Sequence, residues 1–129
     1  MEKVTGIGGL FIRSNDPKKL AQWYADNLGV SLTPKDYGEP SWSQEAGPTV
    51  FQPFPKDTKY FHGSWMLNFR VRDLKAMVAQ LRAMGIAVDV DPKTYPNGQF
   101  ATLHDPVENP IQLWEPAGRD AVRPPQARD

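Results

Sequence analysis

Two stretches of this sequence repeat one pattern about 57 residues apart, and this repeat limits the folds that the chain can adopt. Each stretch opens with an aspartate suited to a helix N-cap and closes with a glycine typical of a helix C-terminus, Asp16 with Gly29 and Asp73 with Gly85. Between these ends the apolar residues recur at helical spacing. The pattern predicts two amphipathic helices of about three turns each.

Strand-like segments flank both predicted helices in the same order. One such segment precedes each helix, at 7–12 and at 65–71. Three more follow each helix, at 30–32, 41–44 and 49–52 in the first repeat and at 87–90, 100–104 and 110–114 in the second. We therefore predict an α+β fold of two βαβββ modules, which form paired curved mixed sheets around a cleft with the helices on the outer faces.

The length of 129 residues suits one domain rather than two independent ones. We predict module one at about 4–54, a linker at about 55–63 and module two at about 64–116. The remaining tail at 117–129 is rich in proline, arginine, aspartate and alanine, so we expect it to fray.

The composition excludes several partners and chemistries. Fifteen basic and fifteen acidic residues give a net charge of zero, without the basic stripe that nucleic-acid binding needs. The absence of cysteine removes disulfides and thiolate chemistry. No apolar run is long enough to span a membrane, and the first residues lack a secretion signal, so we expect a cytoplasmic protein.

Side chains alternate between the two faces of a strand, and this parity separates core residues from residues that line the predicted cleft. In the segment 65–71, Leu67 and Phe69 are predicted to pack beneath the second helix, which turns Asn68 and Arg70 toward the cleft. The same reasoning and the large aromatic residues give a set of candidate ligand-binding side chains. They are Arg13, Trp42, Gln52, Asn68, Arg70, Phe100, His104, Gln112 and Trp114.

These candidates share a chemistry that suits a small, flat, oxygen-bearing ligand. Amides donate and accept hydrogen bonds, arginine binds carboxylate or phosphate, and indole rings stack on planar molecules. His104 stands beside Asp105, which suggests an acid–base pair, but adjacent strand residues point to opposite faces. We therefore assign no catalytic residue.

Several short motifs in both repeats add a family resemblance. They are 8–12 with 16–17, 23–29, 69–74, 81–85 and the closing hairpin at 104–116. Together they resemble the vicinal oxygen chelate superfamily, which contains glyoxalase I, bleomycin-resistance proteins and extradiol dioxygenases. The resemblance covers about 4–116, and it implies the paired βαβββ fold and a homodimer.

In the metalloenzymes of that superfamily, the resemblance implies that histidine or glutamate from the first and last strands of each module holds a divalent ion. The corresponding positions here are Gly9, Gln52, Met66 and Gln112. None is a carboxylate or an imidazole, and Gly9 has no side chain at all. We therefore expect no cofactor and no metal at this position.

Three functions remain open at this stage. The first is a metal-free protein that binds a small organic molecule, as resistance proteins do. The second is a glyoxalase-like lyase or isomerase, or a dioxygenase-related enzyme, that uses Gln52 and Gln112 with a recruited divalent metal. The third is a non-catalytic assembly subunit with a vestigial cleft.

Overall fold

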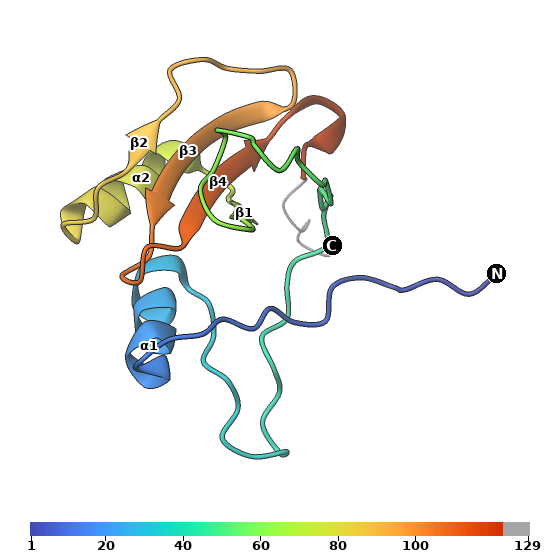
Figure 1. The fold of residues 1–129 in the computed structure, drawn as a ribbon, viewed down its shortest axis with the longest axis vertical. Coiled ribbons are helices and arrows are strands. Elements are labelled where there is room, and N and C mark those ends of the chain that lie inside the picture. The colour runs from blue at the N-terminus through green and yellow to red at the C-terminus, as the bar shows by residue number, and fades with distance from the viewer. Residues whose placement is uncertain (123–129) are drawn as a thin grey trace, which may run out of the picture.

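The computed structural model describes residues 1–122 and contains one four-stranded mixed sheet with two α-helices (Figure 1). The sheet order is β1-β4-β3-β2, in which β1 runs parallel to β4 and the other neighbours are antiparallel. The elements are α1 (Pro17–Leu28), β1 (Leu67–Arg70), α2 (Leu74–Ala83), β2 (Asp89–Val90), β3 (Gly98–His104), β4 (Pro110–Pro116) and the 3-10 turn η1 (Gly118–Asp120).

Both predicted helices are confirmed, with the predicted caps. The Asp16 carboxylate accepts a hydrogen bond from the backbone N–H of Lys19 at 3.1 Å, and Gly29 ends α1 in the left-handed conformation at φ 72°. Asp73 caps α2 in the same way. Glu115 on β4 adds a second cap to α2, because its carboxylate accepts from the backbone N–H of Leu74 at 2.8 Å. This tertiary cap ties the start of α2 to the sheet.

The second repeat folds as the predicted βαβββ unit, from β1 through β4. Its four strands fall within or overlap the predicted segments. The first and last strands of the unit are neighbours: β1 is an edge strand of the sheet, and β4 lies beside it in the interior. This pairing sets Asn68 directly beside Gln112.

The first repeat departs from the prediction, because the segments 7–12, 30–32, 41–44 and 49–52 are not strands in this structure. A strand exists only when a neighbouring strand accepts and donates its backbone hydrogen bonds, and within residues 1–122 these segments have no such neighbour. Their apolar side chains are left in solvent: Phe11 is 95% exposed and Phe51 is 85% exposed. The predicted pair of sheets around a cleft is therefore not seen in the described residues.

The core lies on the helix side of the sheet and unites the two repeats. Leu81 of α2 packs with Ile111 and Leu113 of β4, and all three side chains are fully buried. Leu20 and Tyr24 of α1 belong to the same cluster. Truncating a fully buried leucine or isoleucine to alanine costs about 2–5 kcal/mol, so this cluster accounts for much of the stability.

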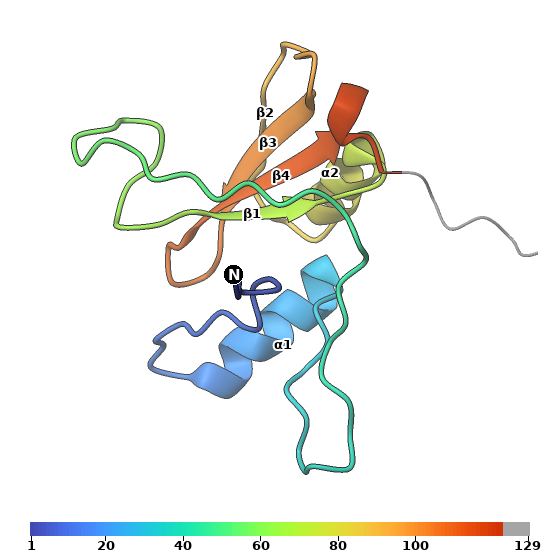
Figure 2. The ribbon, with the colours of Figure 1, turned by 90° about the vertical axis from the view of Figure 1, so that its right-hand side faces the viewer.

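Within the described residues, both α-helices pack on the core side, and neither covers the opposite side of the sheet. The segment that leads into β1, green in Figures 1 and 2, crosses the sheet on the side away from α2. Beyond β4, the backbone N–H of Ala117 donates to the carbonyl of Asn97, and η1 follows. The rest of the tail that we expect to fray, 123–129, lies outside the described residues. Among the described helices, neither length nor hydropathy is sufficient for a membrane crossing.

Candidate functional site

Six side chains form two rows across the helix-free side of the sheet, and we call them the polar–aromatic face. The strand register places Asn68, Gln112 and Thr102 in one row and Arg70, Trp114 and Phe100 in the next. Parity predicted this arrangement for the second repeat, and Leu67 and Phe69 pack against the core on the other side as expected. The face thus combines amides with aromatic rings.

Gln112 is the polar centre of this face and is only 6% exposed. Its Oε1 accepts a hydrogen bond from Asn68 Nδ2 at 2.8 Å, and its Nε2 donates to the hydroxyl of Tyr60 at 2.7 Å. The hydrogen bond from Asn68 orients the amide so that its Nε2–H group points toward Tyr60. The side chain is therefore held in one orientation by partners on both ends of its amide.

Trp114 supplies a rigid aromatic platform next to Gln112. The indole Nε1 donates to the carbonyl of Asn97 at 2.9 Å, which fixes the ring orientation. Phe100 lies parallel to the indole with ring centroids 6.2 Å apart, and Tyr95 meets Phe100 edge-on at 5.9 Å. The buried, hydrogen-bonded indole of Trp114 has little freedom to lose when a flat ligand stacks nearby.

The predicted linker covers part of this face, which the sequence reasoning missed. Tyr60 reaches Gln112, and Phe54 stacks on Tyr60 with centroids 5.4 Å apart and meets Phe61 edge-on at 5.3 Å. Three aromatic residues within eight positions are unusual for a solvated linker, and this clustering was the available signal. The segment is part of the site.

Arg70 faces the predicted side, but its guanidinium already has a partner within the chain. Arg70 Nη2 donates to the carbonyl of Glu45 at 3.1 Å, and Arg72 forms an ion pair with the Glu45 carboxylate. A side chain at Gly47 would collide with the Arg70 guanidinium. Arg70 therefore holds the segment before β1 against the sheet edge instead of standing free as an anion clamp.

Arg13, Trp42 and Gln52 lie in segments of the first repeat that form no helix or strand. Within residues 1–122, none of the three forms a hydrogen bond or an aromatic pair with Asn68, Gln112 or Trp114. Gln52 is exposed, and the strand predicted at 49–52, which was to set it opposite Gln112, is missing.

His104 lies exposed on β3 and is not paired with Asp105. Its imidazole stacks on that of His62, with centroids 5.1 Å apart, and His62 Nε2 lies 2.9 Å from the carbonyl oxygen of Glu108. Asp105 points to the opposite side, as alternation along a strand requires. The geometry gives no His–Asp acid–base pair.

Asp105 is instead a buried structural hub, 2% exposed. Its carboxylate accepts hydrogen bonds from the Tyr24 hydroxyl and the Asn109 side chain, both at 2.7 Å, and from the backbone N–H groups of Val107 and Asn109, both at 2.9 Å. Burial raises the pKa of Tyr24, and the hydrogen bond and charge of Asp105 raise it further. Tyr24 therefore remains a protonated donor that docks α1 onto the β3–β4 turn.

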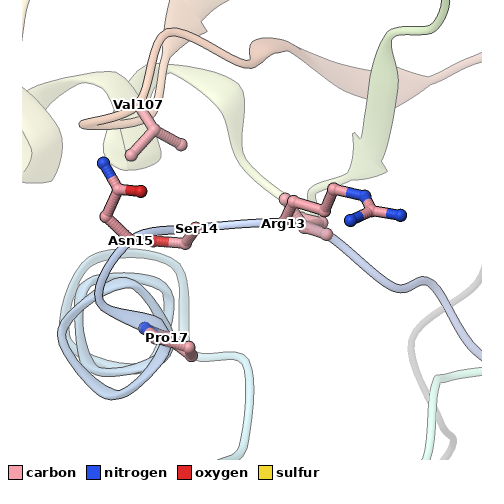
Figure 3. A pocket seen from close by; sticks show the side chains of 6 residues that line it. Arg13, Ser14, Asn15, Pro17 and Val107 are labelled. Atoms are coloured by element: carbon pink, nitrogen blue, oxygen red, sulfur yellow. The ribbon is translucent and has the colours of Figure 1, made fainter.

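Two hollows in the surface are not lined by Gln112 or Trp114. The larger, about 610 Å³, opens beside the start of α1, and in Figure 3 Asn15 and Val107 lie at it while the Arg13 guanidinium extends away from Asn15. The smaller, about 340 Å³, is lined at β3 by Thr102 and His104, so it borders the polar–aromatic face at Thr102, which pairs with Gln112. The polar–aromatic face itself combines a buried amide of fixed orientation with aromatic rings, a combination that suits ligand recognition.

The residues at the superfamily metal position do not fit a divalent ion. Gly9 offers no side chain, Met66 offers a thioether, and the Gln112 oxygen is already bonded to Asn68. Within residues 1–122, no three histidine, aspartate or glutamate side chains lie close enough together to hold a metal.

The sequence matches the model of a known family. A family model described as a glyoxalase-like domain matches residues 9–114. The chain belongs to the glyoxalase-like domain family. This places it in the vicinal oxygen chelate superfamily and confirms the resemblance noted in the sequence. No curated protein sequence matches the chain significantly.

Solved structures share the fold. The antibiotic binding protein TnmS3 from Streptomyces sp. CB03234 is 24% identical with a TM-score of 0.61, and the match covers 91% of this chain and 100% of that one. A glyoxalase/bleomycin resistance protein from the same organism is 26% identical with a TM-score of 0.51, covering 81% and 95%. Lactoylglutathione lyase from Agrobacterium tumefaciens is 15% identical with a TM-score of 0.56, covering 88% and 96%.

Proposed function

We propose that this chain is a non-catalytic binding protein that holds a small, flat, oxygen-bearing organic molecule on the polar–aromatic face without a metal. The observation that carries this proposal is the buried Gln112 amide, whose orientation is fixed by Asn68 beside the Trp114 platform. TnmS3, which shares the fold, is named an antibiotic binding protein. That name supports the same broad class of function.

The physical basis is the selectivity of a buried donor. A buried N–H group left without an acceptor costs about 1–3 kcal/mol, so a ligand that displaces the Tyr60 hydroxyl must bring an oxygen to Gln112 in its place. Stacking near Trp114 and Phe100 favours a planar ring system. The two requirements together select an aromatic molecule with a hydroxyl or carbonyl oxygen at its edge.

Calorimetric titration of hits from a screen of aromatic acids and antibiotics tests this function. We expect Gln112→Ala to weaken binding about tenfold, because about 1.4 kcal/mol of hydrogen bonding is lost. Gln99→Ala is the matched control, since Gln99 is an exposed glutamine of β3 on the other parity, and it should leave the affinity unchanged. A chelator should also have no effect. Equal affinity in Gln112→Ala, or binding that requires a metal, would contradict the proposal.

We further propose that the protein acts as a homodimer, on the basis of the apolar side chains that it leaves in solvent. Phe11 is 95% exposed and Phe51 is 85% exposed. They lie in the apolar segments 7–12 and 49–52, which have no strand partner within the described residues. Exposed apolar surface of this kind is typical of protein–protein contacts.

A second copy of this chain is the partner that suits these segments. Each is predicted as a strand from its sequence and lacks a neighbour within the described residues, so pairing with another copy would satisfy its backbone and bury its apolar side chains. Gln52 lies in one of these segments, so pairing with the second copy would bring Gln52 to a binding face.

Sedimentation velocity tests the dimer. We expect the wild-type chain to sediment as a dimer at micromolar concentration, and the double variant Phe11→Ser with Phe51→Ser to sediment as a monomer. Tyr37→Ser removes an equally exposed aromatic residue outside the two segments and should leave the dimer intact. A monomeric wild-type protein would disprove this assembly.

A further inference from the structure

The contact between Tyr60 and Gln112 suggests how the binding face is closed and what it recognises. We propose that the segment 53–63 is a lid, and that the Tyr60 phenol occupies the subsite for a phenolic oxygen of the ligand. This inference rests on the proposed function, because it specifies the ligand class of that site. It also assigns a role to a segment that the sequence presents as a linker.

The chemistry of the occupied donor defines the ligand class. Gln112 Nε2 donates to the Tyr60 hydroxyl at 2.7 Å, and the hydrogen bond that Asn68 Nδ2 donates to Gln112 Oε1 orients the N–H group toward Tyr60. The structure thus shows this donor satisfied by a phenol. A phenolic ligand that replaces Tyr60 exchanges one hydrogen bond for an equivalent one, so the buried amide is never left unpaired.

The burial of the two partners indicates which one moves. Gln112 is 6% exposed and lies in a central strand, whereas Tyr60 is 57% exposed. Because Tyr60 is already more than half exposed, it loses little apolar burial when it moves away from Gln112. Displacement of Tyr60 is therefore far less costly than any movement of the sheet.

The segment is built to move as a unit. The backbone N–H of Thr58 donates to the carbonyl of Pro55 at 3.0 Å, and that of Tyr60 donates to the Thr58 hydroxyl at 3.2 Å. Phe54 stacks on Tyr60, so these two side chains move together. Gly63 lies at the end with φ 75°, a conformation that favours glycine and allows the chain to change direction next to β1.

Few side-chain contacts join the lid to the rest of the described chain. Its side chains make two polar contacts with other described residues, Tyr60 with Gln112 and His62 with the carbonyl of Glu108, and the His62 ring stacks on His104. Elements with few buried contacts open at low free energy. A closed lid lowers the apparent affinity for ligand by the fraction of molecules in which it is open, so weakening the Tyr60 contact should strengthen binding.

The test uses 4-methylphenol, which is the tyrosine side chain as a free molecule, and toluene, which lacks the oxygen. Binding is followed by NMR at the Gln112 side-chain amide. In Tyr60→Phe the competing hydroxyl is gone, so we expect 4-methylphenol to bind about fivefold more tightly than to the wild-type chain, the equivalent of about 1 kcal/mol for one hydrogen bond. Toluene binding should not change.

Two further variants complete this experiment. Tyr60→Ala removes the ring as well and should bind 4-methylphenol at least as tightly as Tyr60→Phe. Tyr37→Ala removes an exposed tyrosine elsewhere and should behave as the wild-type chain does. Unchanged or weaker 4-methylphenol binding in Tyr60→Phe, or an equal gain for toluene, would overturn the lid.

The results distinguish a failure of the lid proposal from a failure of the proposed function. If screened ligands bind and depend on Gln112, but Tyr60→Phe binds 4-methylphenol no better than the wild type, the function stands and the lid is wrong. If 4-methylphenol binds better in Tyr60→Phe while no larger molecule depends on Gln112, the lid stands and the proposed function is wrong.

Discussion

Replacing Asp105 with alanine is expected to lower the free energy of unfolding by about 3–5 kcal/mol, one of the two largest effects in this protein. The carboxylate is buried and accepts four hydrogen bonds, from Tyr24, Val107 and twice from Asn109. Alanine leaves two backbone N–H groups in the β3–β4 turn without an acceptor. It also breaks the polar link between α1 and the second repeat.

Urea unfolding measures this loss, with two variants for comparison. Tyr24→Phe removes one of the four hydrogen bonds and should cost about 1–2 kcal/mol. Asp57→Ala removes an exposed aspartate in the lid and should change stability by no more than about 0.5 kcal/mol. If Asp105→Ala is no less stable than Asp57→Ala, Asp105 is not the hub that docks α1.

Replacing Gly98 with alanine is the second large expected effect, a loss of about 3 kcal/mol or more. Gly98 begins β3 at φ 137°, which L-residues rarely adopt, and an added Cβ would overlap the backbone carbonyl oxygen of Glu115. The same Cβ would lie 2.8 Å from the Trp114 indole nitrogen. The variant should therefore loosen both the strand pairing and the aromatic platform.

Gly85→Ala is the matched control for this prediction. Gly85 also has a positive φ, 80°, but nothing lies within 4 Å of a Cβ added there. Its replacement should cost about 1–2 kcal/mol, the penalty of the left-handed conformation alone. Thermal unfolding followed by tryptophan fluorescence compares the two variants. Equal losses would mean that the close approach of Gly98 to Glu115 contributes nothing.

The helices and the second repeat were predictable because their signals are local. Asp16 and Asp73 cap the turns that follow them, and the glycines after each helix mark its end. Strand alternation at Leu67–Arg70 was sufficient to place Asn68 on the polar–aromatic face. These features depend on residues a few positions apart, so a single sequence contains them.

The first repeat could not be predicted in the same way, because a strand also needs a partner. The residue pattern at 7–12 and 49–52 indicates only a tendency to form a strand, whereas the backbone hydrogen bonds of a strand depend on where another segment lies. The Tyr60–Gln112 contact was missed for a related reason. It joins residues 52 positions apart, and no periodicity in the linker indicates which face it covers.

The central claim is that ligands bind at the Gln112 amide on the helix-free side of the sheet. NMR resonances of the backbone amides and of the asparagine and glutamine side-chain amides, recorded during titration with a ligand from the screen, test it directly. We predict saturable shifts at Gln112 and Asn68, with Gln99 unmoved. Shifts confined to Asn15 beside α1, or to the backbone of 87–89 at the smaller hollow, would place the ligand elsewhere and contradict the claim.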